Sequence, residues 1–276
     1  MGIIVLMDTL GIENAVMAGF DSIARTTNFV AALWPRHCKA LVSECGFLIG
    51  SQELETTWLR PNAGYQWQYQ YYFGIERGAA GCDRYAHDFA RLTWELVSLP
   101  WEFHNTTFAQ SASALDNPDH VAITIHNYRR SPGLAHGKTK SDCIERKLAA
   151  FSGIAVPTIT IEGVADGAPH PDPSACARRF AERDEHRLLT VAIGHNPPRA
   201  SPGESARAVI DADRFLARRM LQFQFRRAGS TSSHQQGRAR SVECVEYRQE
   251  PARRYLFTGT RRRHEPSRQY RGPPPD

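Results

Sequence analysis

Three polar residues follow short apolar runs, at positions where their side chains could act on a substrate. Asp21 follows the run Asn14 to Phe20, and Asp166 and His195 each follow a later run. A carboxylate can attack carbon to form an ester. A histidine oriented by an acid can then activate the water that hydrolyses the ester. These residue types therefore fit covalent hydrolysis.

Each residue also has a simpler interpretation. Asp21 stands beside a helix start, where an acid is typical of an N-cap, and Asp166-Gly167 is typical of a turn. His195 lies in the sequence G-H-N-P-P and could be an exposed loop residue. The setting that the three residues share favours the catalytic interpretation, because all three follow predicted strands, in the order nucleophile, acid and base.

The elements around Asp21 form a predicted α/β unit. The spacing predicts a helix over residues 3–10 on an apolar face of Ile3, Leu6, Met7 and Leu10, ended by Gly11. A buried strand over Asn14 to Phe20 then turns sharply into a helix over Ser22 to Trp34, and Lys39 to Ser43 is a second buried strand. The inward positions expected on that second helix are Ile23, Thr27, Val30 and Ala31.

The remaining chain divides by composition. Residues 51–145 are rich in aromatics, with helical patterns over Gln66–Phe73 and Asp83–Leu99 and a turn or helix start at 116–119, which predicts a helical insertion. The core then resumes with a strand over Ile154–Gly163 that has Pro157 near its start, a helix over Asp172–Arg183, a strand over Arg187–Ile193 and a helix over Gly203–Leu216. The inward positions expected on that last helix are Ala206, Val209, Ile210 and Phe215.

These patterns predict four regions. Residues 1–50 and 146–220 form the two halves of an α/β core, and 51–145 form the insertion between them. Residues 221–276 carry twelve arginines against five acidic residues and little apolar periodicity. We expect this basic tail to be disordered, although arginine runs also suit a nucleic-acid arm.

Composition favours a soluble cytoplasmic protein. The chain of 276 residues is 41% hydrophobic and 23% charged, which is ordinary for a globular protein. Its six cysteines form no C-x-x-C pair, so we expect reduced thiols and no zinc site. No signal sequence or membrane-spanning run is predicted.

The motifs around these residues resemble a known family. Gly19-Phe20-Asp21, the E-G-x-x-D-G that contains Asp166, and Gly194-His195-Asn196 are together similar to α/β-hydrolases of the epoxide hydrolase and haloalkane dehalogenase branch. The resemblance extends over roughly residues 3–216. It implies a partial α/β-hydrolase fold, with a mostly parallel sheet flanked by helices and the insertion forming a helical cap over the site.

The resemblance also implies roles for individual residues. Asp21 is the nucleophile, and His195 with Asp166 forms the base and acid of a catalytic triad. Tyr69 and Tyr128 fall where epoxide hydrolases place two cap tyrosines that polarise the epoxide oxygen. Either tyrosine could instead be an ordinary amphipathic residue of a helix. The backbone N–H of Ser22 is an oxyanion donor.

Three departures from the family pattern affect these expectations. The family places tryptophan at Ser22 and a small residue at Ile23, where a β-branched side chain invites strain of about 1–3 kcal/mol. The strands and the H-G-x-P oxyanion loop that precede the elbow in the family are also absent from this sequence, so we expect an exposed sheet edge. A missing oxyanion donor costs about 10²–10³ in rate.

The function that follows is an epoxide hydrolase-like hydrolase that attacks a small organic substrate through an aspartate ester. No metal or organic cofactor is implied, and we expect neither a nucleic-acid nor a membrane partner; a homodimer is an open possibility. The alternative is a truncated, catalytically silent family member. A haloalkane dehalogenase is a further alternative, disfavoured by the missing tryptophan and by the tyrosine pair.

Overall fold

The computed structural model describes residues 2–46, 58–99, 101–150, 153–167, 180, 184–190 and 192–228, with the side chains of the last helix described as far as Phe215. All of these residues belong to one compact unit, Met1–His234. Of the predicted helix over Asp172–Arg183, the structure describes Phe180 alone, which forms an isolated parallel bridge with Ile154; the predicted tail beyond residue 228 lies outside the described residues.

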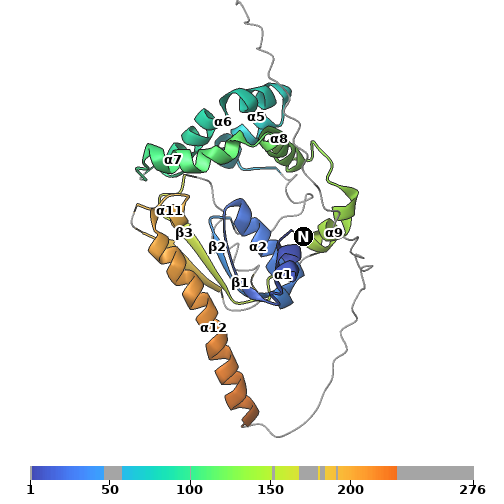
Figure 1. Ribbon diagram of the computed structural model, residues 1–276, viewed down its shortest axis with the longest axis vertical. Helices are drawn as coiled ribbons and strands as arrows, with labels where there is room; N and C mark the ends of the chain where they lie inside the picture. The colour runs from blue at the N-terminus through green and yellow to red at the C-terminus, as the bar shows by residue number, and fades with distance from the viewer. Residues whose placement is uncertain are drawn as a thin grey trace, which may run out of the picture. The chain divides into compact units, whose positions relative to one another are not determined.

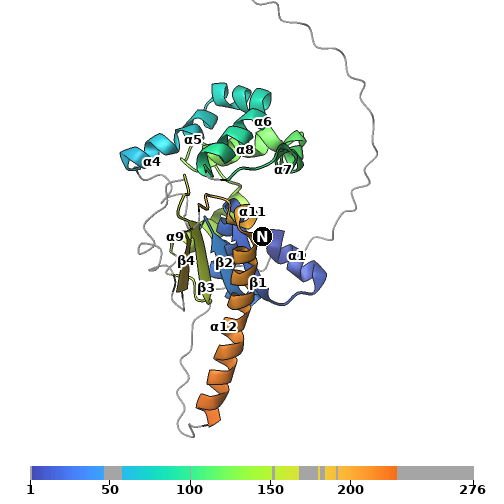
Figure 2. The ribbon, with the colours of Figure 1, turned by 90° about the vertical axis from the view of Figure 1, so that its left-hand side faces the viewer.

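Among the described residues, a parallel sheet of four strands forms the centre (Figure 1; β4 is labelled in Figure 2). Its strands are β1 (Ala15–Phe20), β2 (Cys38–Glu44), β3 (Thr158–Gly163) and β4 (Asp184–Leu189), in the order β1-β2-β3-β4. Every neighbouring pair is parallel. All four carboxyl ends therefore lie along one edge of the sheet, and the α/β class expected from the sequence is confirmed.

Helices cover both faces of this sheet (Figure 1). The first face packs against α1 (Gly2–Leu10), α2 (Ser22–Leu33) and α9 (Asp142–Ala149), and the second against α12 (Pro202–Ala228). Neighbouring residues of β2 alternate between the two cores: Leu41 lies in the first, while Ala40 and Val42 lie in the second. This alternation follows from the two-residue period of a strand.

Further helices lie between β2 and β3 in the chain. These are α4 (Pro61–Gln66), α5 (Gln68–Phe73), α6 (Glu76–Val97), α7 (Asn105–Ala112) and α8 (His120–Arg130), here called the interposed helices. Figure 2 shows them gathered beyond one end of the strands. Aromatic side chains hold them together: Phe73 packs on Phe89 and Tyr128, and Trp94 on Phe108. The segment predicted to be helical therefore does form helices where the structure describes it.

Two predictions near the elbow were wrong in detail. Ile23 is 58% exposed, because the buried face of α2 is formed by Ala24, Thr27 and Asn28 together with Val30 and Ala31. In α1, Met7 is buried, whereas Leu6 and Leu10 are exposed, because the helix contacts the core through Ile3, Ile4 and Met7. The face of α1 that packs against the core is thus rotated relative to the predicted apolar face.

The second half of the core also differs from its prediction. Strand β4 begins at Asp184 and ends at Leu189, rather than spanning Arg187–Ile193. Among the described strands β4 is an edge, and its charged residues are paired: Arg187 forms ion pairs with Glu185 and with Asp211 of α12, whereas Leu188 is 49% exposed, which hides the strand pattern. Helix α12 continues to Ala228, so it includes the first eight residues of the predicted tail.

The face that α12 presents to the sheet is lined by small residues. Ala208 and Ala212 are fully buried and Ser205 donates a hydrogen bond to the Glu44 carboxylate at 2.7 Å, while Val209 and Phe215 are partly buried as expected. Ala206 and Ile210, expected to face inward, are exposed. Small residues let the helix approach the sheet closely, which a large isoleucine would prevent.

Among the described residues, no helix combines the length and the apolar character needed to cross a bilayer.

Enlarging the small inward face of α12 should destabilise the fold. Ala208→Leu would force extra methylene groups into a packed interior, which typically costs about 1–3 kcal/mol. The matched change Ala206→Leu lies on the exposed side and should stay within about 0.5 kcal/mol. Urea unfolding midpoints measure the difference. Equal midpoints for the two variants would contradict the observed helix face.

Candidate active site

Asp21 lies on a strained turn between β1 and α2. Its backbone has φ 49 and ψ −117, a left-handed conformation that is uncommon for a residue other than glycine. The turn is tight: a Cβ on Gly19 would lie 2.7 Å from the backbone of Ile23. Asp21 occupies the N-cap position of α2 but makes no side-chain capping bond. Its carboxylate is therefore not used as a helix cap and projects from the turn instead.

The backbone strain that the sequence led us to expect at Ile23 occurs at other residues instead. Among the described residues other than glycine, positive φ values occur at Asp21, Cys45 and Ala192. The close contact expected at the elbow is made by Gly19 against the Ile23 backbone, and the Ile23 side chain points to solvent. Each of the three strained residues comes after the carboxyl end of a strand, at the same edge of the sheet.

The structure brings Asp21, Asp166 and His195 together, and we call these three residues the acid–base cluster. His195 Nδ1 lies 2.9 Å from Asp166 Oδ2, and His195 Nε2 lies 3.7 Å from Asp21 Oδ1. The side chain of Asp166 is 4% exposed, that of His195 16% and that of Asp21 52%. The ring is thus held from one side by a buried acid and faces a half-exposed acid on the other.

One carbonyl group at the end of α6 fixes both loops of the cluster. The oxygen of Val97 accepts backbone hydrogen bonds from Gly167 and from His195, each at 3.0 Å. Close packing reinforces this arrangement, since a Cβ on Gly194 would lie 2.5 Å from the Cα of Ser98. The interposed helices therefore set the position of the acid and of the base, a contact that the sequence did not predict.

The electrostatics of the cluster favour a charged pair. Burial disfavours the imidazolium, but hydrogen bonds to Asp166 and Asp21 outweigh it and raise the pKa of His195 well above its usual range. Burial also opposes the charge on Asp21, yet His195, the Ser22 N–H and Arg25 lower the pKa of this carboxyl. Both shifts favour a protonated His195 ring beside an ionised Asp21.

Cys45 is a further residue of this site that sequence reasoning did not assign to it. It directly follows β2, has φ 46 and is 2% exposed. Its sulfur, a ring nitrogen of His195 and a carboxylate oxygen of Asp166 lie within 4.8 Å of one another. Burial raises the pKa of the Cys45 thiol to about 11. Its position after a strand, like that of Asp21, was the signal that could have identified it.

Tyr69 and Tyr128 lie side by side in the interposed helices. Their ring centroids are 5.8 Å apart and the rings meet edge to face. Burial, Tyr69 and the Asp21 carboxylate raise the pKa of Tyr128, so its hydroxyl stays protonated and able to donate. The Ser22 hydroxyl donates to Asp21 Oδ2 at 3.2 Å. The hydroxyl groups of Tyr69, Tyr128 and Ser22 are therefore all potential hydrogen-bond donors.

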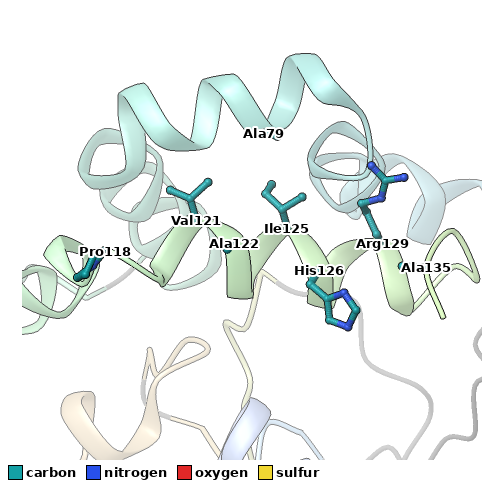
Figure 3. Close-up of a pocket in the computed structure, with 8 residues that line it drawn as sticks. All are labelled: Ala79, Pro118, Val121, Ala122, Ile125, His126, Arg129 and Ala135. Atoms are coloured by element: carbon teal, nitrogen blue, oxygen red, sulfur yellow. The ribbon is translucent and has the colours of Figure 1, made fainter. Parts of the chain in front are cut away.

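A pocket of about 480 Å³ opens between α6 and α8 (Figure 3). Val121 and Ile125 point from α8 toward the helix that carries Ala79, whereas His126 points away from that helix. None of the residues that line this pocket belongs to the acid–base cluster. It is therefore a feature of the interposed helices and separate from the candidate active site.

Comparison with solved structures shows what the fold is similar to. A proposed epoxide hydrolase from Klebsiella pneumoniae is 51% identical, with a TM-score of 0.75, and the match covers 77% of this chain and 70% of that one. A proposed α/β hydrolase from Nostoc sp. PCC 7120 matches at 17% identity and a TM-score of 0.59, over 75% of this chain and 68% of that one. A proposed epoxide hydrolase from Pseudomonas aeruginosa matches at 16% identity and a TM-score of 0.60, over 78% of this chain and 69% of that one.

No profile of a known protein family matches the sequence, and no curated protein matches it. The two matches below 25% identity agree on the fold. The match at 51% identity covers more than two thirds of the other protein. The chain belongs to the α/β-hydrolases, in the epoxide hydrolase-like branch, as the sequence motifs indicated. By family it is a hydrolase.

The charge state of His195 can be tested directly. In the unmodified protein we expect the ring to stay protonated far above about pH 6.5, the ordinary value for histidine. Asp166→Asn and Asp21→Asn should each lower the pKa of His195, because each removes a negative charge from beside the ring. NMR titration of the ring nitrogens measures the shift, with Asp8→Asn, at an exposed position of α1, as the control. A ring that titrates near pH 6.5 in the unmodified protein would contradict the ion pair.

Proposed function

We propose that this chain hydrolyses a small organic substrate of the epoxide class through an ester formed on Asp21. The observation that carries the proposal is the His195 ring, with Nδ1 2.9 Å from Asp166 and Nε2 3.7 Å from Asp21. A histidine between a strained, partly exposed acid and a buried acid fits a nucleophile, a base and an orienting acid. The strained elbow that presents Asp21 supports the same assignment.

The first step opens the epoxide. A carboxylate oxygen of Asp21 bonds to one epoxide carbon while the bond from that carbon to oxygen breaks. The epoxide oxygen gains the electron pair and accepts a proton from Tyr69 or Tyr128. The raised pKa of Tyr128 keeps its proton in place until the oxygen becomes basic. A phenol that donates to a developing alkoxide stabilises the transition state.

The second step hydrolyses the ester. Esterified Asp21 is neutral, so His195 loses one of the two negative charges that raise its pKa. The ring can then release its proton to the tyrosinate that the first step leaves, through solvent, and accept one from water, and the resulting hydroxide attacks the ester carbonyl. The ester C–O bond breaks, the departing diol oxygen takes the proton from His195, and the Asp21 carboxylate is restored. The backbone N–H of Ser22 can donate to the oxygen that becomes negative. Ester formation thus switches His195 from an ion-pair partner to a base.

Two variants should separate the two steps. Asp21→Asn removes the nucleophile and should abolish turnover. His195→Gln leaves the nucleophile but removes the base, so the ester should form and persist. Intact-protein mass spectrometry after mixing with styrene oxide should show an increase equal to the substrate mass in His195→Gln. Turnover that is unchanged in Asp21→Asn would exclude this mechanism.

Matched controls are available on exposed surfaces. Asp213→Asn on α12 and His126→Gln on α8 make the same chemical changes at exposed positions away from the cluster. Both should retain the behaviour of the unmodified chain. Adduct formation in Asp21→Asn at the unmodified rate would show that another residue reacts with the epoxide.

The tyrosine pair should act in the first step alone. Tyr128→Phe removes a donor to the epoxide oxygen and should slow ester formation by about 10²–10³. Tyr69→Phe should have a similar effect, and Tyr71→Phe, an exposed tyrosine of the same helix α5, should have almost none. Adduct formation in the His195→Gln background, followed by mass spectrometry, measures the first step. Equal rates in the Tyr128 and Tyr71 variants would remove the proposed role.

A catalytically silent family member is the second candidate. The observation that favours it is the 52% exposure of the Asp21 side chain. Water that solvates a carboxylate weakens it as a nucleophile, and active sites of this kind exclude water. A folded chain that yields neither adduct nor turnover with epoxides would support this candidate over the hydrolase.

A further inference from the structure

Cys45, Asp166 and His195 form a compact set of potential metal ligands beside the nucleophile. They come from three different strand ends: Cys45 follows β2, Asp166 follows β3 and His195 follows β4. Their potential ligand atoms lie within 4.8 Å of one another. All three side chains are largely shielded, at 2%, 4% and 16% exposure. A thiol, a carboxylate and an imidazole at such distances are the donor types that zinc takes in proteins.

We propose that this site binds a thiophilic divalent cation, of which Zn²⁺ is the representative, and that the bound ion stops ester hydrolysis. The consequence for hydrolysis rests on the proposed function, whereas the binding itself does not. Ligand atoms around a tetrahedral zinc ion are separated by roughly 3–4 Å. Movements of about 1 Å would therefore bring the three side chains to bonding distance.

Binding replaces protons with the ion. The Cys45 thiol proton and the proton between His195 Nδ1 and Asp166 pass to solvent, and the charge of the ion stabilises the thiolate that remains. His195 Nδ1 is the nitrogen that faces Asp166, so it is the nitrogen that would bind the ion. Three protein ligands would leave a fourth position for water or chloride, as in many zinc sites.

The effect on the base follows from the two nitrogens of imidazole. With Nδ1 bound to the ion, the neutral ring carries its proton on Nε2, which is the atom that faces Asp21. Such a ring can donate a hydrogen bond but cannot accept a proton from water. Asp21 is outside the proposed ligand set and can still react. The ion is therefore expected to trap the ester, as His195→Gln does, rather than to prevent its formation.

A spectroscopic experiment tests binding without any need for turnover. Cd²⁺ is titrated into the full chain, and its thiolate charge-transfer absorption in the ultraviolet is recorded; Zn²⁺ affinity is measured by calorimetry. Loss of an outer-shell partner alone typically costs 10–100-fold in metal affinity. Cys45→Ser should therefore lose the cadmium band and weaken Zn²⁺ binding by at least about 10-fold. Cys82→Ser removes another buried thiol, on α6, and should change neither signal.

The unmodified chain provides a second test that requires no variant. Zn²⁺ should slow the labelling of Cys45 by a thiol-alkylating reagent, mapped by peptide mass spectrometry, and should leave Cys82 unaffected. In an active chain, Zn²⁺ should also cause the Asp21 ester to accumulate, and a chelator should release it. Metal binding without turnover would leave the site established while the hydrolase proposal fails. Unchanged Cd²⁺ absorption in a folded Cys45→Ser variant, or no protection of Cys45, would overturn the site.

Discussion

A single carbonyl oxygen, that of Val97, holds the acid and the base of this site in register. Gly167 and His195 are far apart in the chain, yet both donate their backbone N–H to this oxygen. Because Asp166 directly precedes Gly167, the shared acceptor sets the distance across which the carboxylate meets the ring. The buried 2.9 Å contact between Asp166 and His195 thus depends on the end of helix α6 as much as on strands β3 and β4.

Backbone strain at the carboxyl edge of the sheet has a related role. Asp21 and Cys45 adopt left-handed backbone directly after the adjacent strands β1 and β2, a conformation that costs of order 1–3 kcal/mol for such residues. Gly46 permits this arrangement, because a side chain there would collide with the backbone of Asp21. The strained turns direct one carboxylate and one thiol toward the same histidine. The stable parallel sheet provides the rigidity that keeps them there.

The sequence identified the parts of this structure that depend on local pattern. Apolar runs located β1, β2 and β3, and the acids and histidine that follow them lie at one edge, because parallel strands place their carboxyl ends together. The same reasoning failed at β4, where charged residues occupy an edge strand, and at α12, where buried alanines matter more than the exposed Ile210.

The features that the sequence could not provide are contacts between distant segments. The Val97 carbonyl bonds to loops about 70 and 100 residues further along the chain, and no spacing rule connects them. Cys45 lacked any neighbouring cysteine or histidine at a metal-ligand spacing, so its proximity to His195 appears only when β2, β3 and β4 are aligned. The sequence was enough to predict side-chain types and strand ends. The contacts that these side chains make depend on how the strands of the whole sheet are aligned.

The charge on His195 links these features to the chemistry. A general base works best when its pKa lies near the working pH, yet the two flanking acids raise the pKa of this ring well above its usual range. The conflict disappears if the first step neutralises Asp21, because the ring then faces one carboxylate instead of two. A buried Asp166 and a half-exposed Asp21 are suited to this sequence of events: the buried acid is placed to orient the ring, while the exposed acid is placed to meet the substrate. Under the proposed mechanism, the unequal exposure of the two acids suits them to different roles, with Asp21 as the group that changes charge during the reaction.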